Sequence, residues 1–144
     1  MSLSVKKVSS QEDLETVFEI RRQVFVIEQN VEPEEEFDEF EEESAHFLAV
    51  YDNQPVGTAR WRFTEKGVKM ERFAVLDGFR SKGVGSVLVK AVEEDIIASA
   101  QKGTKLYMHA QVSAMGLYLK YGYEKKGDLF VECDIDHYMM EKII

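Results

Sequence analysis

Hydrophobic and polar positions change their spacing several times along the first part of the chain. Residues 3–8 alternate, which predicts a first strand. Ser9 or Ser10 is placed to cap a helix, and Ser9 with Glu12 fits a capping box. Apolar residues then recur at helical spacing up to about Glu28. The chain is therefore expected to begin with a strand and a long helix.

Three strands are predicted next. Residues 46–51 and 56–63 read as strands around a turn at residues 52–55, whose Asp-Asn-Gln-Pro sequence is typical of turns. A second turn at residues 65–67 leads into a third strand at residues 68–76. Because both connections are short, these strands predict an antiparallel meander.

The spacing becomes helical after a polar loop at residues 77–82. A helix is predicted to start at Gly83 and to be closed by Gly103. Residues 105–112 predict a strand, and residues 113–122 a short helix. The last extended pieces are residues 123–126, 129–133 and 137–141. The order of elements predicts a mixed α/β domain.

Length and composition suit one domain. With 144 residues and 44% hydrophobic content, residues 1–144 are expected to form a single domain with a substantial core. No apolar run approaches the length of a membrane span, and the N-terminal residues lack a signal-peptide pattern. Cys133 is the single cysteine, so no intrachain disulfide can form. These features predict a reducing, cytoplasmic setting.

The net charge of −9 is concentrated in one segment. Residues 28–43 contain ten acidic residues and no Lys or Arg, whereas the rest of the chain is close to neutral. Such a segment repels a phosphate-rich polymer, which argues against nucleic-acid binding. It attracts a cationic partner. A solvated acidic loop is the alternative interpretation.

A strand, a glycine-containing loop and a helix start meet at Arg80-Ser81-Lys82-Gly83-Val84-Gly85. A helix N-terminus has unpaired N–H groups and a partial positive charge, and glycines let the backbone approach a ligand closely. Arg80 and Lys82 add positive charge. Together these features predict a pyrophosphate site. A glycine-bearing helix start with solvated basic residues is the alternative, and the two common nucleotide-binding glycine motifs are absent.

Residues 111–123 hold a second motif. Ala114, Leu117, Tyr118 and Tyr121 share one face of the short helix predicted there. On its own this pattern is typical of a packing helix with core tyrosines. Its position about thirty residues after the first motif favours a joint functional role.

The two motifs together resemble the GNAT N-acetyltransferase superfamily. The hexapeptide that starts at Arg80 follows residues 71–75 and is similar to the coenzyme-A loop, while residues 111–123 are similar to the motif that borders the pantetheine. Likeness to the narrower ElaA-like branch rests on residues 24–29, Glu36, Asp38, Glu39, His46, residues 57–60 and residues 136–140. Departures are residues 133–136, where the branch commonly has a glycine and a proline before its histidine, and Tyr121, usually aliphatic in the superfamily.

The resemblance implies an α/β (α+β) GNAT fold, with a central mixed, mostly antiparallel twisted sheet of about six to seven strands flanked by helices. It also implies acetyl-CoA as co-substrate. The contacts would be made by Phe73, Ala74, Val75, Arg80, Ser81, Lys82, Gly83, Val84, Gly85, Ser86, Gln111 and Ala114. The backbone of residues 73–75, where the strand is splayed open, would donate to the oxyanion. Tyr118 has the position of the acid that protonates the leaving thiolate.

The base that removes the proton of the amine stays open at this point. Glu71 is a candidate, because regular alternation places it on the face of Phe73 and Val75, where an apolar site would raise its pKa. Its alternative role is a surface partner for Arg60 or Arg62 across the sheet. Further candidates are Glu28, His46 and water.

Two functions are compatible with these motifs. The preferred one is an enzyme that transfers acetyl from acetyl-CoA to a primary amine, whose small-molecule or peptide acceptor is expected to be cationic. The alternative is a non-catalytic acyl-CoA-binding sensor or protein-interaction module. No metal, nucleic-acid or membrane partner is expected, and a homodimer stays open. His46, His109 and His137 are interpreted as structural rather than catalytic.

Overall fold

The computed structural model describes residues 2–144. Its elements in chain order are β1 (Leu3–Lys7), α1 (Gln11–Arg21), the π-helix η1 (Arg22–Glu28), α2 (Pro33–Glu36), β2 (Ala45–Tyr51), β3 (Gln54–Thr64), β4 (Gly67–Val75), the 3-10 turn η2 (Asp77–Phe79), α3 (Val84–Ser99), β5 (Lys105–Gln111), the 3-10 turn η3 (Val112–Ala114), α4 (Met115–Lys120), β6 (Glu124–Glu132) and β7 (Ile135–Ile143). The expected meander and the strand–loop–helix at the centre are confirmed.

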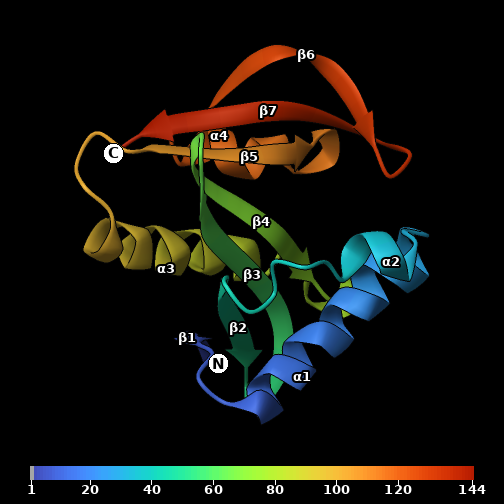
Figure 1. Ribbon diagram of the computed structural model, residues 1–144. Helices are drawn as coiled ribbons and strands as arrows, with labels where there is room; N and C mark the ends of the chain where they lie inside the picture. The colour runs from blue at the N-terminus through green and yellow to red at the C-terminus, as the bar shows by residue number, and fades with distance from the viewer. Residues whose placement is uncertain (1) are drawn as a thin grey trace.

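The strands form a seven-stranded sheet in the order β1-β2-β3-β4-β5-β7-β6. All neighbouring strands run antiparallel except β4 and β5. This parallel pair is short, with Val68 opposite Leu106 and Lys69 opposite Tyr107. Beyond Lys69 the two strands separate, so that β1–β4 and β5–β7–β6 form two diverging halves (Figure 1). The expected mixed, mostly antiparallel sheet is confirmed.

Helices cover both faces of the β1–β4 half (Figure 1). On one face, α3 buries Leu88 and Val92 against the core residues of β2, β3 and β4. On the other face, α1 and η1 bury Val17 and Val24 against Leu48 and Ala74. The helical periodicity of both segments in the sequence reflects these two buried stripes.

The helix boundaries follow from capping groups. The side chain of Ser10 accepts a hydrogen bond from the Asp13 N–H at 3.1 Å, so the expected capping box of Ser9 and Glu12 is wrong. The chain stays helical to Glu28, as expected, although α1 passes into η1 after Arg21. Further along, Gly83 is the left-handed N-cap of α3, and the first helical residue is Val84.

A β-bulge interrupts the alternation of β4. Thr58 lies opposite Ala74 and Arg60 lies opposite Glu71, and Arg72 has a positive φ of 58°. Phe73 consequently packs on the α3 side and Ala74 on the α1 side, whereas Glu71 faces Arg60. Regular alternation along this strand, which predicted that Glu71 shares a face with Phe73, is therefore wrong.

Candidate active site

The loop between β4 and α3 is exposed and strained into an open conformation. Ser81, Lys82 and Gly83 are exposed, and Ser81 and Gly83 have φ values of 65° and 86°. A Cβ atom added at Gly83 would meet nothing within 4 Å. No side chain caps the start of α3, so the N–H groups of its first turn are available to an outside acceptor. In a helix of 16 residues these groups also carry the positive end of the dipole.

Arg80 lies at the surface and is paired with neighbouring groups of the protein. Its guanidinium lies 2.6 Å and 2.7 Å from the two carboxylate oxygens of Glu28 and donates to the Val75 carbonyl at 3.0 Å. The hydrogen bond from Arg80 lowers the pKa of Glu28, which keeps that carboxylate ionised. Arg80 does carry the expected positive charge, and its pairing with Glu28 joins the loop to η1. The same pairing makes Glu28 a poor proton acceptor.

Gly85 connects this loop to the helix that carries Tyr118. A Cβ atom at Gly85 would lie 3.0 Å from the Leu117 Cδ2 atom. The missing side chain thus lets α4 pack closely on the first turn of α3. The two sequence motifs meet at this contact.

A cavity of about 480 Å³ occupies the opening between the two halves of the sheet. Its lining residues come from η1, α2, β4, β5, η3, α4, β6 and β7 and from the loops beside them: Phe25, Gln29, Val31, Glu35, Glu36, Lys69, Met70, Glu71, Arg72, Phe73, Met108, His109, Gln111, Ala114, Tyr118, Glu132, Cys133, Ile135 and His137. Five expected site residues therefore line one cavity: Glu71, Phe73, Gln111, Ala114 and Tyr118.

Tyr118 is a buried residue of the cavity wall. It is 5% exposed, and its ring meets Phe73 edge-on at a centroid distance of 5.7 Å. Burial raises the pKa of Tyr118, so the phenol stays protonated at neutral pH. Within residues 2–144 its hydroxyl has no protein hydrogen-bond partner. A protonated, unpaired hydroxyl in the cavity wall is suited to donate a proton to a leaving group.

Glu71 is held in place by cations. One oxygen lies 2.7 Å from Arg60 and 2.9 Å from Arg62, and the other lies 3.1 Å from Lys69. Burial alone would raise the pKa of Glu71, but these three cations lower it to about 2. The expected raised pKa is therefore wrong, and the geometry supports the alternative role as partner of Arg60 and Arg62. A carboxylate with so low a pKa is a weak base.

The acidic segment is only partly solvated. Arg21 and Arg60 are fully buried and bridge it to the sheet: Arg21 contacts Glu36 at 2.6 Å, Arg60 contacts Asp38 at 2.7 Å, and both arginines contact Glu41. The solvated-loop interpretation is wrong for these carboxylates. The exposed acidic residues without such an arginine are Glu32, Glu34, Glu35, Glu39, Glu42 and Glu43.

His46 belongs to the same buried region and not to the cavity lining. Its Nε2–H donates to the Glu41 carbonyl at 2.8 Å, and its ring meets Phe18 edge-on. Burial lowers the pKa of His46, so the ring is neutral. The structure does not bring His46 to the cavity, and its expected structural role is supported.

Gln111, His109 and His137 of the cavity wall each form a hydrogen bond that the sequence did not predict. Gln111 donates to Gln29 at 2.9 Å and so joins β5 to the end of η1. His109 Nδ1 lies 3.0 Å from a Glu132 oxygen, and His137 Nδ1 donates to the Ile135 carbonyl at 2.6 Å. The strand period contains a signal for His109, because it lies two residues before Gln111 and shares its face.

Clusters of metal-ligating side chains and membrane-spanning helices were sought among the described residues. Among residues 2–144, no group of three or more His, Cys, Asp or Glu side chains is arranged to hold a metal ion. None of the helices described in that range is both long and apolar enough to cross a bilayer.

Comparisons with known proteins agree with this geometry. The sequence model of a family described as "Acetyltransferase (GNAT) domain" matches residues 5–144. The uncharacterized N-acetyltransferase YjcF of Bacillus subtilis is 42% identical over 136 residues, which covers 92% of this chain and 94% of YjcF. The crystal structure of Escherichia coli ElaA has a TM-score of 0.87 at 22% identity and covers 98% of this chain and 99% of ElaA.

A GNAT family acetyltransferase from Elizabethkingia anophelis, solved with acetyl-CoA bound, has the same fold. Its TM-score is 0.73 at 17% identity, and the match covers 99% of this chain and 98% of that chain.

Proposed function

The chain belongs to the GNAT acetyltransferase family, and from this premise we propose that it transfers acetyl from acetyl-CoA to the primary amine of a cationic acceptor. Its family and its relatives make it an N-acetyltransferase, which disfavours the non-catalytic module. The observation that carries the proposal is the cavity between β4 and β5, which has the unpaired hydroxyl of Tyr118 in its wall.

The donor would bind on the α3 side of the sheet. The open loop of Ser81, Lys82 and Gly83 and the N–H groups up to Ser86 provide an anion site for the pyrophosphate. Gln111 and Ala114 line the cavity into which the acyl end of the donor would extend. The relative solved with acetyl-CoA bound supports this choice of donor.

The reacting carbonyl would lie where β4 leaves β5. The pairing of β4 with β5 ends at Lys69, so the backbone of Phe73, Ala74 and Val75 has no paired strand on that side. N–H groups freed in this way can stabilise a developing oxyanion. Tyr118, which packs on Phe73, would then protonate the departing thiolate.

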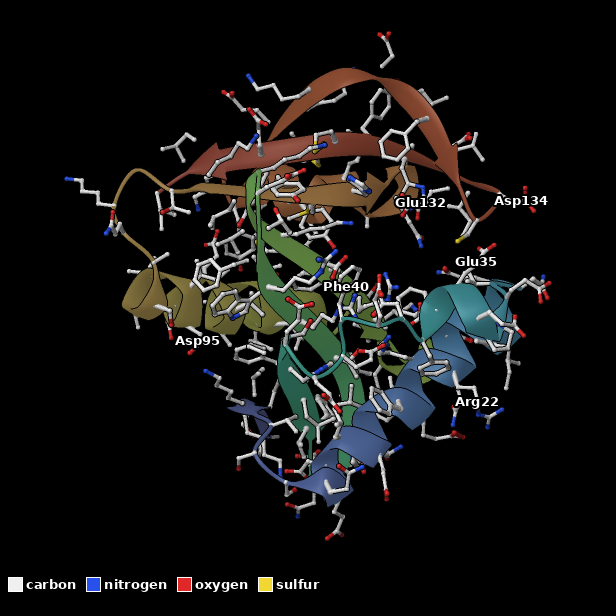
Figure 2. All side chains as sticks on the ribbon, in the orientation of Figure 1. Arg22, Glu35, Phe40, Asp95, Glu132 and Asp134 are labelled. Atoms are coloured by element: carbon white, nitrogen blue, oxygen red, sulfur yellow. The ribbon has the colours of Figure 1, made fainter. Side chains whose placement is uncertain are left out.

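The acceptor would enter from the side of α2 and the β6–β7 turn. Glu35 and Glu132 line the cavity there, and Figure 2 shows Glu35 on α2 and Glu132 on the strand above it. The exposed carboxylates of residues 32–35 lie beside this entrance. Negative charge at an entrance raises the local concentration of a cation. These features support an ammonium-bearing acceptor.

Release of free CoA from acetyl-CoA tests the proposal directly. The purified protein is incubated with acetyl-CoA and a panel of polyamines, aminoglycosides, lysine peptides and amino sugars. We expect cationic amines to be turned over at the highest kcat/KM. If acetyl-CoA binds but none of the amines increases CoA release, the proposed reaction is wrong; if the best acceptor is neutral or anionic, only the cationic preference is wrong.

A further inference from the structure

Resting on the proposed function, we propose that His109, oriented by Glu132, accepts the proton of the attacking amine on the side of the cavity opposite Tyr118. Leu106, Met108 and Ala110 of β5 belong to the core beneath α3. Since side chains alternate along a strand, His109 and Gln111 face the other way. On this face Gln111 donates to Gln29, the residue after η1, and His109, Gln111 and Gln29 all line the cavity.

The hydrogen bond between His109 and Glu132 selects the tautomer of the imidazole. A hydrogen bond from His109 lowers the pKa of Glu132, so its carboxylate is ionised and can only accept. The proton of the neutral ring therefore lies on Nδ1, which is 3.0 Å from the Glu132 oxygen. Nε2 keeps its lone pair and is free to take a proton. Glu132 also stabilises the imidazolium that results.

The surroundings hold this ring and connect it to water. Phe130 meets the His109 ring edge-on at a centroid distance of 5.2 Å. The side chain of His109 is 26% exposed, so a proton accepted from the substrate can pass on to solvent. By contrast, Glu71 and Glu28 are paired with cations, and His46 lies outside the cavity lining.

His137 is the competing base. It also lines the cavity, and its Nδ1–H donates to the Ile135 carbonyl at 2.6 Å, which leaves Nε2 unprotonated in the neutral ring. Within residues 2–144 its side chain forms no hydrogen bond to a carboxylate, and it is 6% exposed while stacked on Phe130. His137 therefore lacks the direct hydrogen bond to a carboxylate that orients His109, although the charge of Glu132 also acts on it.

The protons balance in this arrangement. The acceptor arrives as an ammonium ion and gives its first proton to His109 Nε2. The free amine then attacks the thioester carbon, a carbon–nitrogen bond forms, and the carbon–sulfur bond breaks. Tyr118 protonates the thiolate and recovers a proton from the nitrogen as the amide forms. The proton on His109 passes to water, so the products are the amide, the CoA thiol and one H⁺.

Two amines of similar size can distinguish a role of His109 as the base from a purely structural role. Ethylamine is a cation at neutral pH and must lose a proton, whereas 2,2,2-trifluoroethylamine is a free base because its fluorines withdraw electrons. The variants are His109→Gln and, as an independent second one on the exposed end of β6, Glu132→Gln. Glu124→Gln is the matched control, since Glu124 is on the same strand with its side chain 75% exposed. Acetyl-CoA binding shows that each variant is folded.

We expect His109→Gln to lower kcat/KM for ethylamine by about a hundredfold or more and to change that for trifluoroethylamine far less. Glu132→Gln should show the same selectivity with a smaller loss, and Glu124→Gln neither. Equal loss for both amines, no loss, or selective loss in His137→Gln instead would overturn the role of His109. If the wild-type protein acetylates neither probe nor any amine of the panel, the proposed function fails, and the base assignment with it.

Discussion

Substitution of Glu71 by Gln separates its two interpretations, because one predicts lost catalysis and the other lost stability. The folded protein holds the pKa of Glu71 at about 2 against an ordinary value of 4.5. That difference corresponds to about 3 kcal/mol of stability. Since the folded-state pKa is the lower one, this stability is fully present above pH 4.5 and is lost as the pH falls toward about 2.

The free energy of unfolding of Glu71→Gln, measured in urea, should therefore be about 3 kcal/mol below that of the wild type at pH 7. The gap should shrink as the pH is lowered through 4.5. Glu65→Gln, in the exposed turn after β3, serves as control and should change little. We expect kcat of folded Glu71→Gln to stay near that of the wild type. A stable variant whose kcat falls about a hundredfold would show that Glu71 is the base after all.

Three further outcomes are expected. Gly83→Val should weaken acetyl-CoA binding measured by calorimetry, because the valine side chain would fill the open approach at the α3 N-terminus and valine is disfavoured at a φ of 86°. Unchanged affinity in a folded variant would contradict the coenzyme site. Tyr118→Phe should lower kcat by about a hundredfold with little change in the KM for acetyl-CoA, and full turnover would leave the tyrosine a packing residue. Replacing Glu32, Glu34 and Glu35 together by Gln should raise the acceptor KM at similar kcat, and added salt should do the same in the wild type. Glu36 is left unchanged in this variant because it is buried against Arg21. An unchanged acceptor KM would mean that these carboxylates serve only solubility.

Much of the fold could be predicted because each element keeps its own hydrophobic period. The strands of the meander alternate and α3 carries a helical stripe, so residues 68–76 and the helix after Gly83 are visible without coordinates. The bulge in β4 is invisible, because the residue with positive φ is Arg72 and not a glycine. Regular alternation through Arg72 places Glu71 on the face of Phe73, whereas the bulge turns it toward Arg60.

The site could be predicted where a short motif carries it and not where distant charges meet. The loop around Gly83 and the helix with Tyr118 are contiguous in sequence. The partners of Glu36, Asp38 and Glu41 are arginines that only the topology brings near. The strand period could have indicated His109 as a cavity residue, since it is on the same strand face as Gln111. Its pairing with Glu132 could not be predicted without the β5–β7–β6 register.

The buried arginines divide the acidic segment into inner carboxylates that they bind and outer carboxylates that face solvent. Arg21 and Arg60 hold Glu36 and Glu41 from beneath, so the backbone of the segment is fixed whatever its outer side chains are. Mutations at the outer positions Glu32 and Glu34 should therefore change the free energy of unfolding little. An evolving population can sample new acceptor preferences there without first acquiring stabilising mutations elsewhere, which is the condition under which one scaffold diversifies into enzymes for different amines.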